Sequence, residues 1–344
     1  MSQFPGQQHA PNPGGQPGQP PGPMGAPRHQ PTMPAPKPRR GAGPVILAAL
    51  GVLALGMIGL IIYSLLGGPD YQNDDYQPPP PGQVVPLPDI RVDEVDAILS
   101  DNALYAQQLP VPIRCELRNP EIDVMTAEDG AVKDHIDDVM GCAMRVWDQP
   151  FRGTERFELV RPAVNIYHDT VVSPCGGGQR SGPNASYCAA NQEVYFSRQL
   201  AAAHPGFAII DERRALDVVM AHEFAHGMQA RNGALLAEGY KSRRADEQTA
   251  LENSRRIELQ ADCYAGMYVQ AIHESIDLDD AEMANMTQAM RAVGDDEIAG
   301  RPGDPAVVGN HGHAENRVYW FQIGLTSTEI GRCNTFTVAP EHVR

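Results

Sequence analysis

The sequence predicts an α+β protein, mainly helical with a small antiparallel sheet, preceded by a disordered tail and one transmembrane helix. Three observations support this fold class. Residues 1–44 are rich in Pro, Gly and Gln, residues 45–66 form an uninterrupted apolar run, and the rest of the 344-residue chain contains several helix-like patterns and two strand-like ones. Helices should therefore make up most of the folded part.

The tail and the apolar run are the first two segments. Residues 1–44 contain no acidic residue and cannot bury a core, so we expect them to be disordered. Residues 45–66 are long enough to cross a bilayer, because about 20 apolar residues span it as a helix. A cleaved signal peptide is the alternative, but this run is too long for one and no small-residue cleavage site follows it.

Charge predicts the orientation of this span. Cations precede it and acidic residues follow it, namely Arg28, Lys37, Arg39 and Arg40 before, and Asp70, Asp74 and Asp75 after. Because positive residues stay on the cytoplasmic side, we expect a single-pass cell-membrane protein with a cytoplasmic N-terminus and an extracytoplasmic domain. The lipid bilayer is then one partner of the chain.

The part of the chain after the span is acidic. Four of the 27 Lys and Arg residues precede the span, which leaves 23 against all 43 Asp and Glu residues, a net charge of −20. A domain of this charge has no electrostatic attraction for nucleic acid or for anionic membrane surfaces. We therefore expect no nucleic-acid partner, and solubility is a sufficient explanation of the charge.

Residues 67–88 are expected to be an extended, Pro-rich linker, and residues 89–344 the folded domain. Apolar residues at helical spacing predict its helices. They are Ile90–Tyr105, Asp134–Trp147, Arg213–Asn232, Glu247–His273, Asp280–Val293 and Ala314–Gly324. Between them, Ala234–Asp246 is expected to be a charged connection and Asp295–Asn310 a Gly- and Pro-rich loop. Two runs rich in β-branched and aromatic residues, Phe157–Tyr167 and Glu193–Ser197, predict the sheet.

All six cysteines follow the predicted span, where an oxidising environment favours disulfides. Cys175 and Cys188 flank a Gly- and Ser-rich loop, so a bridge between them is the natural pairing. The pairs Cys115 with Cys142 and Cys263 with Cys333 would complete the set, although other connectivities fit the sequence. Zinc ligation by cysteine is the rival interpretation, disfavoured because no C-x-x-C pair exists.

The motif most informative about function is His222-Glu223-Phe224-Ala225-His226, an H-E-x-x-H pattern. In a helix, the two histidines lie one turn apart on one face and can bind the same zinc ion. Glu223 lies beside them, within reach of a zinc-bound water. Such a short pattern also recurs by chance, in which case the two histidines and the acid have no common role.

A catalytic zinc needs a third protein ligand and one open position. Glu258, 32 residues after His226, is the best candidate, and Asp262 lies one helical turn further on. Asp262 could accept the free ring N–H of a ligating histidine and so orient it. The alternative is an amphipathic surface helix, but apolar neighbours suggest that this face is buried, and buried acids need partners.

The ligand set predicts the chemistry. Zinc lowers the pKa of its water to about 7, and Glu223 would take a proton from that water as it attacks a peptide carbonyl. A further donor would stabilise the oxyanion, and His311 is the leading candidate, with His313 beside it. In zinc peptidases an edge strand often lines the cleft, and we expect Glu193–Ser197 to be that strand, a structural hairpin being the alternative.

The segments HEFAHGMQ, ELQADCYAG, AVGDD and HGHAENRVYWF followed by RCNTF resemble the bacterial putative neutral zinc metallopeptidase family. The resemblance extends from about Cys115 to Phe336 and implies a zincin-like fold. It implies His222, His226 and Glu258 as zinc ligands, Glu223 as the catalytic base and Asp262 as the orienting acid. It does not extend to the metzincins, whose third histidine would fall at Asn232.

The last part of the resemblance is less regular. His311-Gly312 and Arg317 match the family pattern, whereas His313, Ala314 and Asn316 depart from its usual residues. These departures leave the predicted ligands unchanged. Because the residues themselves differ from the family pattern, no substrate contact is inferred at the departing positions.

Together these observations predict a membrane-anchored zinc metallopeptidase with one zinc ion per chain and a peptide or protein substrate. An endopeptidase is favoured, because no obvious charge pair marks a site for a peptide terminus. Two alternatives remain open. One is an envelope-anchored scaffold or binding protein that a zinc ion stabilises without turnover, and the other is a zinc amidase that acts on cell-wall peptides. Glu223 counts against the scaffold, since a structural site needs no base.

Overall fold

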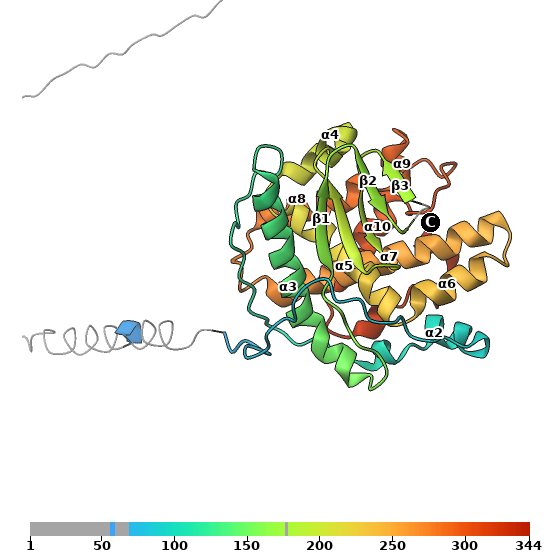
Figure 1. Cartoon of the computed structure of the whole chain (residues 1–344), viewed down its shortest axis with the longest axis horizontal. Helices are drawn as coiled ribbons and strands as arrows, with labels where there is room; N and C mark the ends of the chain where they lie inside the picture. The colour runs from blue at the N-terminus through green and yellow to red at the C-terminus, as the bar shows by residue number, and fades with distance from the viewer. Residues whose placement is uncertain (1–55, 59–68, 176–177) are drawn as a thin grey trace, which may run out of the picture. The chain divides into compact units, whose positions relative to one another are not determined.

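The computed structural model describes residues 56–58, 69–175 and 178–344 (Figure 1). The chain divides into two units, Met1–Leu65 and Leu66–Arg344, and the second holds the fold described below. The predicted disordered tail and the predicted membrane span, apart from residues 56–58, lie outside the described residues. Among the described residues, no helix has both the length and the apolar character that a membrane crossing requires.

The main sheet has three strands in the order β1 (Ala163–Tyr167), β5 (Glu193–Ser197) and β4 (Ala185–Cys188). β4 is antiparallel to β5, but β1 is parallel to it, with Val164 opposite Val194. The predicted antiparallel sheet is therefore wrong, and the sheet is mixed. The reason is the connection. β1 and β5 are joined through a separate antiparallel hairpin, β2 (Thr170–Ser173) with β3 (Gly178–Ser181), and through β4.

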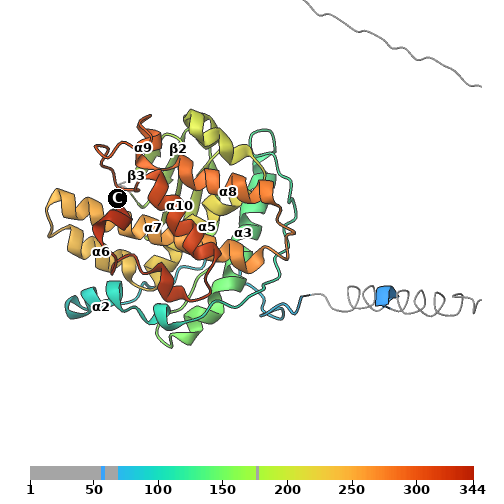
Figure 2. The ribbon, with the colours of Figure 1, turned by 180° about the vertical axis from the view of Figure 1, so that it is seen from behind.

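Helices form the rest of the domain. They are α2 (Val95–Ser100), α3 (Asp129–Gly153), α4 (Leu200–Ala203), α5 (Ala215–Arg231), α6 (Ala234–Ser242), α7 (Glu247–Ile272), α8 (Asp280–Ala292), α9 (Asp295–Ile298) and α10 (Ala314–Leu325), with short 3-10 segments between them. α5 is central, because it packs against α3, α6, α7, α8 and β4 and is buried along almost its whole length. Figures 1 and 2 both show α5 and α7 between α6 on one side and α8 on the other.

The long helices follow the predicted patterns closely, but two connections differ. Ala234–Asp246, predicted as a charged connection, contains α6. Gly233 has a φ of 85°, so it ends α5 and at once allows a new helix to start in another direction. The predicted loop Asp295–Asn310 begins with the short helix α9, and Ile90–Tyr105 is divided between α2 and two 3-10 turns.

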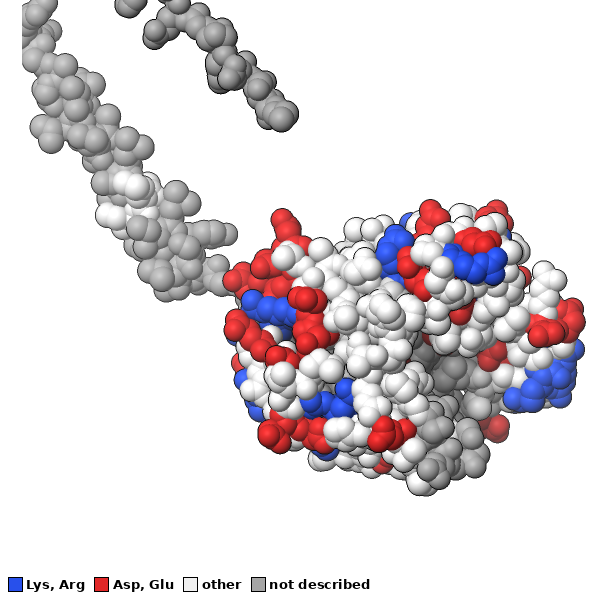
Figure 3. All heavy atoms as spheres, turned by 90° about the horizontal axis from the view of Figure 1, so that it is seen from above, with Lys and Arg blue, Asp and Glu red and all other residues white. Residues whose placement is uncertain are grey.

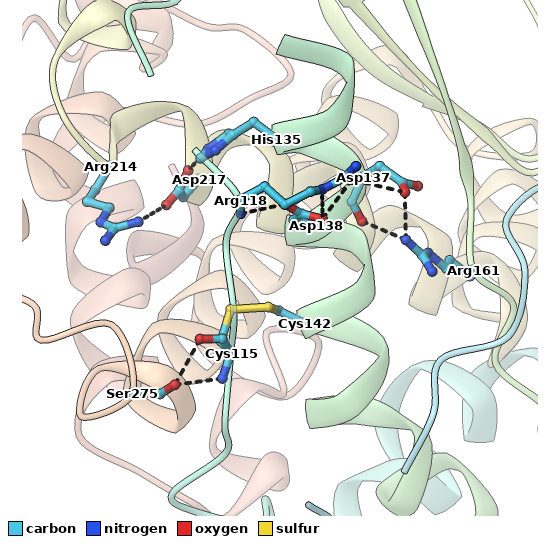
Figure 4. The surroundings of a disulfide bond; sticks show 10 residues. All are labelled: Cys115, Arg118, His135, Asp137, Asp138, Cys142, Arg161, Arg214, Asp217 and Ser275. Atoms are coloured by element: carbon cyan, nitrogen blue, oxygen red, sulfur yellow. Dashed lines mark hydrogen bonds and ion pairs between the residues drawn. A yellow bond between two sulfur atoms is a disulfide. The ribbon is translucent and has the colours of Figure 1, made fainter. Parts of the chain in front are cut away.

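The three predicted disulfides are all present. Cys115–Cys142, Cys175–Cys188 and Cys263–Cys333 have Cα–Cα distances of 5.3, 5.6 and 5.6 Å. Figure 4 shows the first of them between α3 and the segment before it. Ser275 holds the same segment, because its hydroxyl accepts from the Cys115 N–H at 2.7 Å and donates to the Cys115 carbonyl at 2.9 Å.

The same view shows how α3 is joined to α5. Buried His135 on α3 lies 2.5 Å from Asp217 in the first turn of α5, measured from Nε2 to Oδ1. The other carboxylate oxygen of Asp217 is 3.3 Å from Arg214. This buried contact fixes the beginning of α5, since a buried carboxylate is stable only with such partners.

Residues 69–88, part of the predicted extended linker, run along the domain. The Gln72 N–H donates to the Pro112 carbonyl at 2.8 Å, and Tyr76 packs against the core. Arg231, at the end of α5, donates to the carbonyls of Val85 and Pro86 at 3.1 and 2.8 Å. A soluble fragment should therefore begin at residue 69, because a later start removes contacts of the folded domain.

On the face shown in Figure 3, acidic and basic side chains are interspersed around a largely uncharged central area. The described part of this face has no continuous basic surface.

Two glycines allow α7 and α10 to cross at very short distance. A Cβ at Gly266 would collide with the carbonyl oxygen of Phe321, and a Cβ at Gly324 would collide with that of Cys263. The disulfide Cys263–Cys333 joins the same region of α7 to the chain after α10. The crossing brings Arg317, on α10, against α7.

We predict that Gly324→Ala lowers the free energy of unfolding by about 3 kcal/mol or more, because the new methyl group meets backbone atoms that cannot rotate away. Denaturant unfolding followed by circular dichroism measures the change. Gly130→Ala in α3 is the matched control, since nothing lies within 4 Å of its added Cβ. An equal effect of the two substitutions would contradict the close crossing.

Candidate metal centre

The predicted site residues come together where α5 and α7 pack against each other. His222, Glu223 and His226 lie on α5, and Glu258 lies on α7. One ligand atom of each histidine and one carboxylate oxygen of Glu258 all lie within 4.8 Å of one another. Nε2 of His222 is 3.2 Å from Glu258 Oε2, and Nε2 of His226 is 3.5 Å from Oε1.

This donor set fits a zinc ion. Two imidazole nitrogens and one carboxylate oxygen are three ligands of the type that catalytic zinc takes, and a fourth position stays open for water or substrate. The histidine rings have centroids 4.6 Å apart and are nearly perpendicular, so both Nε2 atoms can point to one centre without ring overlap. H-E-x-x-H in a helix, with a glutamate from a second helix, produces this geometry.

Each histidine is held through its second ring nitrogen. His222 Nδ1 lies 2.8 Å from Oδ1 of Asp262, the residue for which the sequence predicts an orienting role. His226 Nδ1 lies 2.8 Å from the side-chain oxygen of Gln229, a contact that sequence analysis missed. The Gln229 amide in turn donates to the Ile257 carbonyl at 2.8 Å. A polar residue three positions after His226 is the signal that could have indicated this partner.

Asp262 is fully buried, and a second charged group stabilises it. Arg317, only 2% exposed, donates to the same Asp262 Oδ1 at 2.8 Å. Its other terminal nitrogen lies 3.8 Å from Glu258 Oε2. Arg317 therefore neutralises both acids of α7 that face the histidines, which a charge buried away from water requires.

Glu223 and Asp262 each have a buried carboxylate oxygen without a partner among the described residues, but of the two only Glu223 lines the cleft. Glu223 is 6% exposed, and its Oε2 is buried with no hydrogen-bond partner among the described residues. Native structures rarely leave such an oxygen unpaired, so each case needs an explanation. A carboxylate that must accept a proton from a reacting molecule is one, and Glu223 lines the cleft in which such a molecule would lie.

The two loop histidines have different positions. His311 lines the cleft, and its Nδ1 is 3.2 Å from Asp295 Oδ1. The other oxygen of Asp295 accepts from the backbone N–H groups of His311 and Gly312 at 3.0 and 2.7 Å. His313 is outside this cleft, with Nε2 2.8 Å from the Val307 carbonyl. The role of Asp295 was missed, although it lies in the AVGDD segment.

The cleft has a volume of about 520 Å³ and runs between the sheet and the helices. Its strand wall is β4, with Ala185, Ser186 and Tyr187 among the lining residues. The prediction that Glu193–Ser197 is the edge strand is wrong, because β5 lies between β1 and β4 and both of its edges are paired. A pattern of β-branched residues identifies a strand but not its neighbours.

The histidines and the acids of the site also shift one another's pKa values. Burial lowers the pKa of His222, but hydrogen bonds with Asp262 and Glu258 outweigh burial and raise this pKa to about 10. Burial raises the pKa of Glu258, but the charge of His226 and hydrogen bonds from both histidines hold it well below its usual range. A cation that binds here must therefore displace protons from the histidines.

Comparison with known proteins agrees with this geometry. The family model described as putative neutral zinc metallopeptidase matches residues 115–336, which is more than half of the chain. The chain belongs to this family. Family membership implies a zinc-dependent hydrolase, and the match includes both helices that carry the candidate ligands.

Individual relatives are more distant. The chain is 28% identical over 193 residues to the uncharacterized protein YpfJ of Escherichia coli, which covers 55% of this chain and 66% of that relative. It is 30% identical over 195 residues to the uncharacterized protein Rv2575 of Mycobacterium tuberculosis, covering 52% and 64%. The matched segment thus spans just under two thirds of these relatives. No solved structure matches the chain significantly.

We predict that Glu258→Ala abolishes stoichiometric zinc binding, whereas Asp262→Asn weakens it only about 10–100-fold, because Asp262 acts on the metal through His222. Zinc content by mass spectrometry and competition with a chelator measure the two effects. Glu247→Gln, on an exposed turn of α7, is the control. If Asp262→Asn lost all zinc and Glu258→Ala kept it, the ligand assignment would be incorrect.

Proposed function

We propose that this protein is a membrane-anchored zinc-dependent peptidase that hydrolyses peptide bonds, with His222, His226 and Glu258 as zinc ligands. The observation that carries the proposal is the unpaired carboxylate oxygen of Glu223, buried beside a three-donor site in a cleft. A zinc ion held there would activate a water molecule at neutral pH and polarise a peptide carbonyl. A scaffold protein with a structural metal would have no use for this free base.

In this proposal, the other side chains of the site transfer protons, stabilise charge or orient the zinc ligands. Glu223 takes the proton of the attacking water and delivers it to the leaving amine. Asp295 fixes the His311 ring through Nδ1, so that Nε2 is the nitrogen available to the cleft. As a hydrogen-bond donor, His311 Nε2 would stabilise the negative charge that develops on the carbonyl oxygen of the peptide. Asp262 and Gln229 keep the two zinc-binding histidines in the orientation that directs Nε2 toward Glu258.

The edge strand supports an extended peptide as substrate. Among the described strands, β5 is the one neighbour of β4, so an extended peptide could be added at the other edge of β4. β4 also lines the cleft that contains Glu223. A peptide bound along β4 would pass the candidate metal site without its ends being enclosed, which favours an endopeptidase.

We predict that Glu223→Gln retains one zinc per chain but lowers the rate of peptide cleavage at least 100-fold, because the amide cannot accept the proton. Cleavage of denatured casein is compared for wild type, Glu223→Gln and chelator-treated protein. Zinc-loaded wild type that cleaves no faster than Glu223→Gln would refute the peptidase proposal and favour a scaffold.

The membrane anchor is part of the same proposal and is supported by the apolar run of residues 45–66. We predict that the full chain sediments with membranes after carbonate washing, whereas a chain that starts at residue 69 stays in the supernatant. Both forms should bind zinc equally, because the site lies wholly after residue 69. Recovery of the full chain in the supernatant would contradict the anchor.

A further inference from the structure

We propose that Glu238 determines substrate specificity by binding a cationic group of the peptide, while the opposite end of the cleft binds a large apolar side chain. The inference rests on the proposed function, because it assigns a substrate class to the same cleft. Glu238 is the one lining carboxylate of the described cleft with no role in the candidate metal site, since Glu223 and Glu258 are the others.

The position of Glu238 separates it from the metal ligands. It lies on α6, which packs against α5 and α7, and it lines the cleft together with Leu235. The side chain is half-buried, and its Oε1 accepts a hydrogen bond from the Ser242 hydroxyl at 2.5 Å. The amide of Asn253 donates to that hydroxyl at 3.2 Å. The carboxylate is therefore held in one orientation at the wall of the cleft.

The charge of Glu238 has no direct partner in the described protein. No Lys, Arg or His of the described residues forms an ion pair with it, although Arg243 on the adjacent exposed turn contributes at longer range. The one arginine that lines the cleft, Arg317, is bound to Asp262. Because burying a carboxylate without a cation is unfavourable, an amine or guanidinium group from a ligand is the complementary partner.

The other end of the cleft has a different chemistry. Its apolar lining comes from four elements and the residue that ends α8, with Leu200, Phe207, Ile210, Val219, Met290 and Val293. These residues gather where α8, the 3-10 turn 205–211 and the first half of α5 meet, and Figures 1 and 2 show α8 and α6 on opposite sides of α5. The candidate metal site lies between the two ends, since His222 and His226 follow Val219 along α5.

This arrangement matches a peptide with a basic residue on one side of the scissile bond and a bulky apolar residue on the other. The cation could belong to a Lys or Arg side chain or to a free amino terminus, because both offer the same charge and donors to a carboxylate. The two sources are separated by comparing acetylated with free peptides of the same sequence.

The test uses the full chain in detergent, loaded with zinc and carrying Glu223→Gln, so that peptide binding is measured without turnover. The probes are octapeptides of alanine with a central Lys-Leu or Leu-Lys pair, their norleucine equivalents, and acetylated and free forms of each. We expect the preferred Lys peptide to bind about tenfold more tightly than its norleucine equivalent. Wild-type cleavage of the same peptides gives the corresponding kcat/KM ratios.

When Glu238→Gln is added to the Glu223→Gln protein, the Lys peptide and its norleucine equivalent should bind about equally. The amide keeps the size of the side chain and its contact with Ser242 but has no charge. Glu238→Lys should reverse it in favour of a Glu-containing peptide, a gain that damage to the fold cannot produce. Glu247→Gln, an exposed glutamate of α7, should leave the preference unchanged. If free peptides bind about tenfold more tightly than acetylated ones, whether the central residue is Lys or norleucine, the cationic group is the amino terminus.

An unchanged Lys preference in Glu238→Gln, or no preference for any cation in the parent protein, would overturn the inference. If the proposed function is wrong, the experiment gives a different result. In that case the wild-type protein cleaves none of the peptides, while the binding preference and its dependence on Glu238 persist.

Discussion

The site depends on the buried carboxylate of Asp262. One of its oxygens contacts His222 Nδ1 and Arg317 at 2.8 Å each, which connects α5, α7 and α10 at one atom. A buried carboxylate without such partners would cost several kcal/mol, so the three helices cannot separate without losing this interaction. The contact also needs the short crossing of α7 and α10 at Gly266 and Gly324. The packing of these three helices and the orientation of His222 therefore depend on the same contact.

From Arg317 the network continues to the other side of the cleft. A terminal nitrogen of Arg317 donates to the carbonyl of His311 at 3.3 Å, and Asp295 binds the same residue through its ring and its backbone. Asp296 accepts from the Ala314 N–H at 2.8 Å and so attaches α9 to the start of α10. The loop histidine His311 and the candidate ligand His222 are thus positioned by one connected set of hydrogen bonds, although 89 residues separate them in sequence.

The sequence predicts this protein well where one local pattern carries the information. Helical spacing located α5 and α7, and the H-E-x-x-H motif with Glu258 and Asp262 identified five side chains that the structure brings together. It failed where the information lies in pairing. Strand patterns do not specify neighbours, so the parallel pairing of β1 with β5 and the edge position of β4 were missed. Asp295 was missed for the same reason, because its partner His311 is 16 residues away.

Position relative to the cleft separates Glu223 from the groups that contact the histidine rings. Asp262, Gln229 and Asp295 each contact a histidine ring of the site, and none of them lines the cleft. Among the described residues with a buried, unpartnered side-chain atom, Glu223 and Arg317 are the two that line it. Arg317 uses its terminal nitrogens on Asp262 and His311, whereas Glu223 forms no hydrogen bond through its buried Oε2. A ligand in the cleft could donate a proton to the free oxygen of Glu223, whereas the unpartnered Oδ2 of Asp262 belongs to a residue that does not line the cleft.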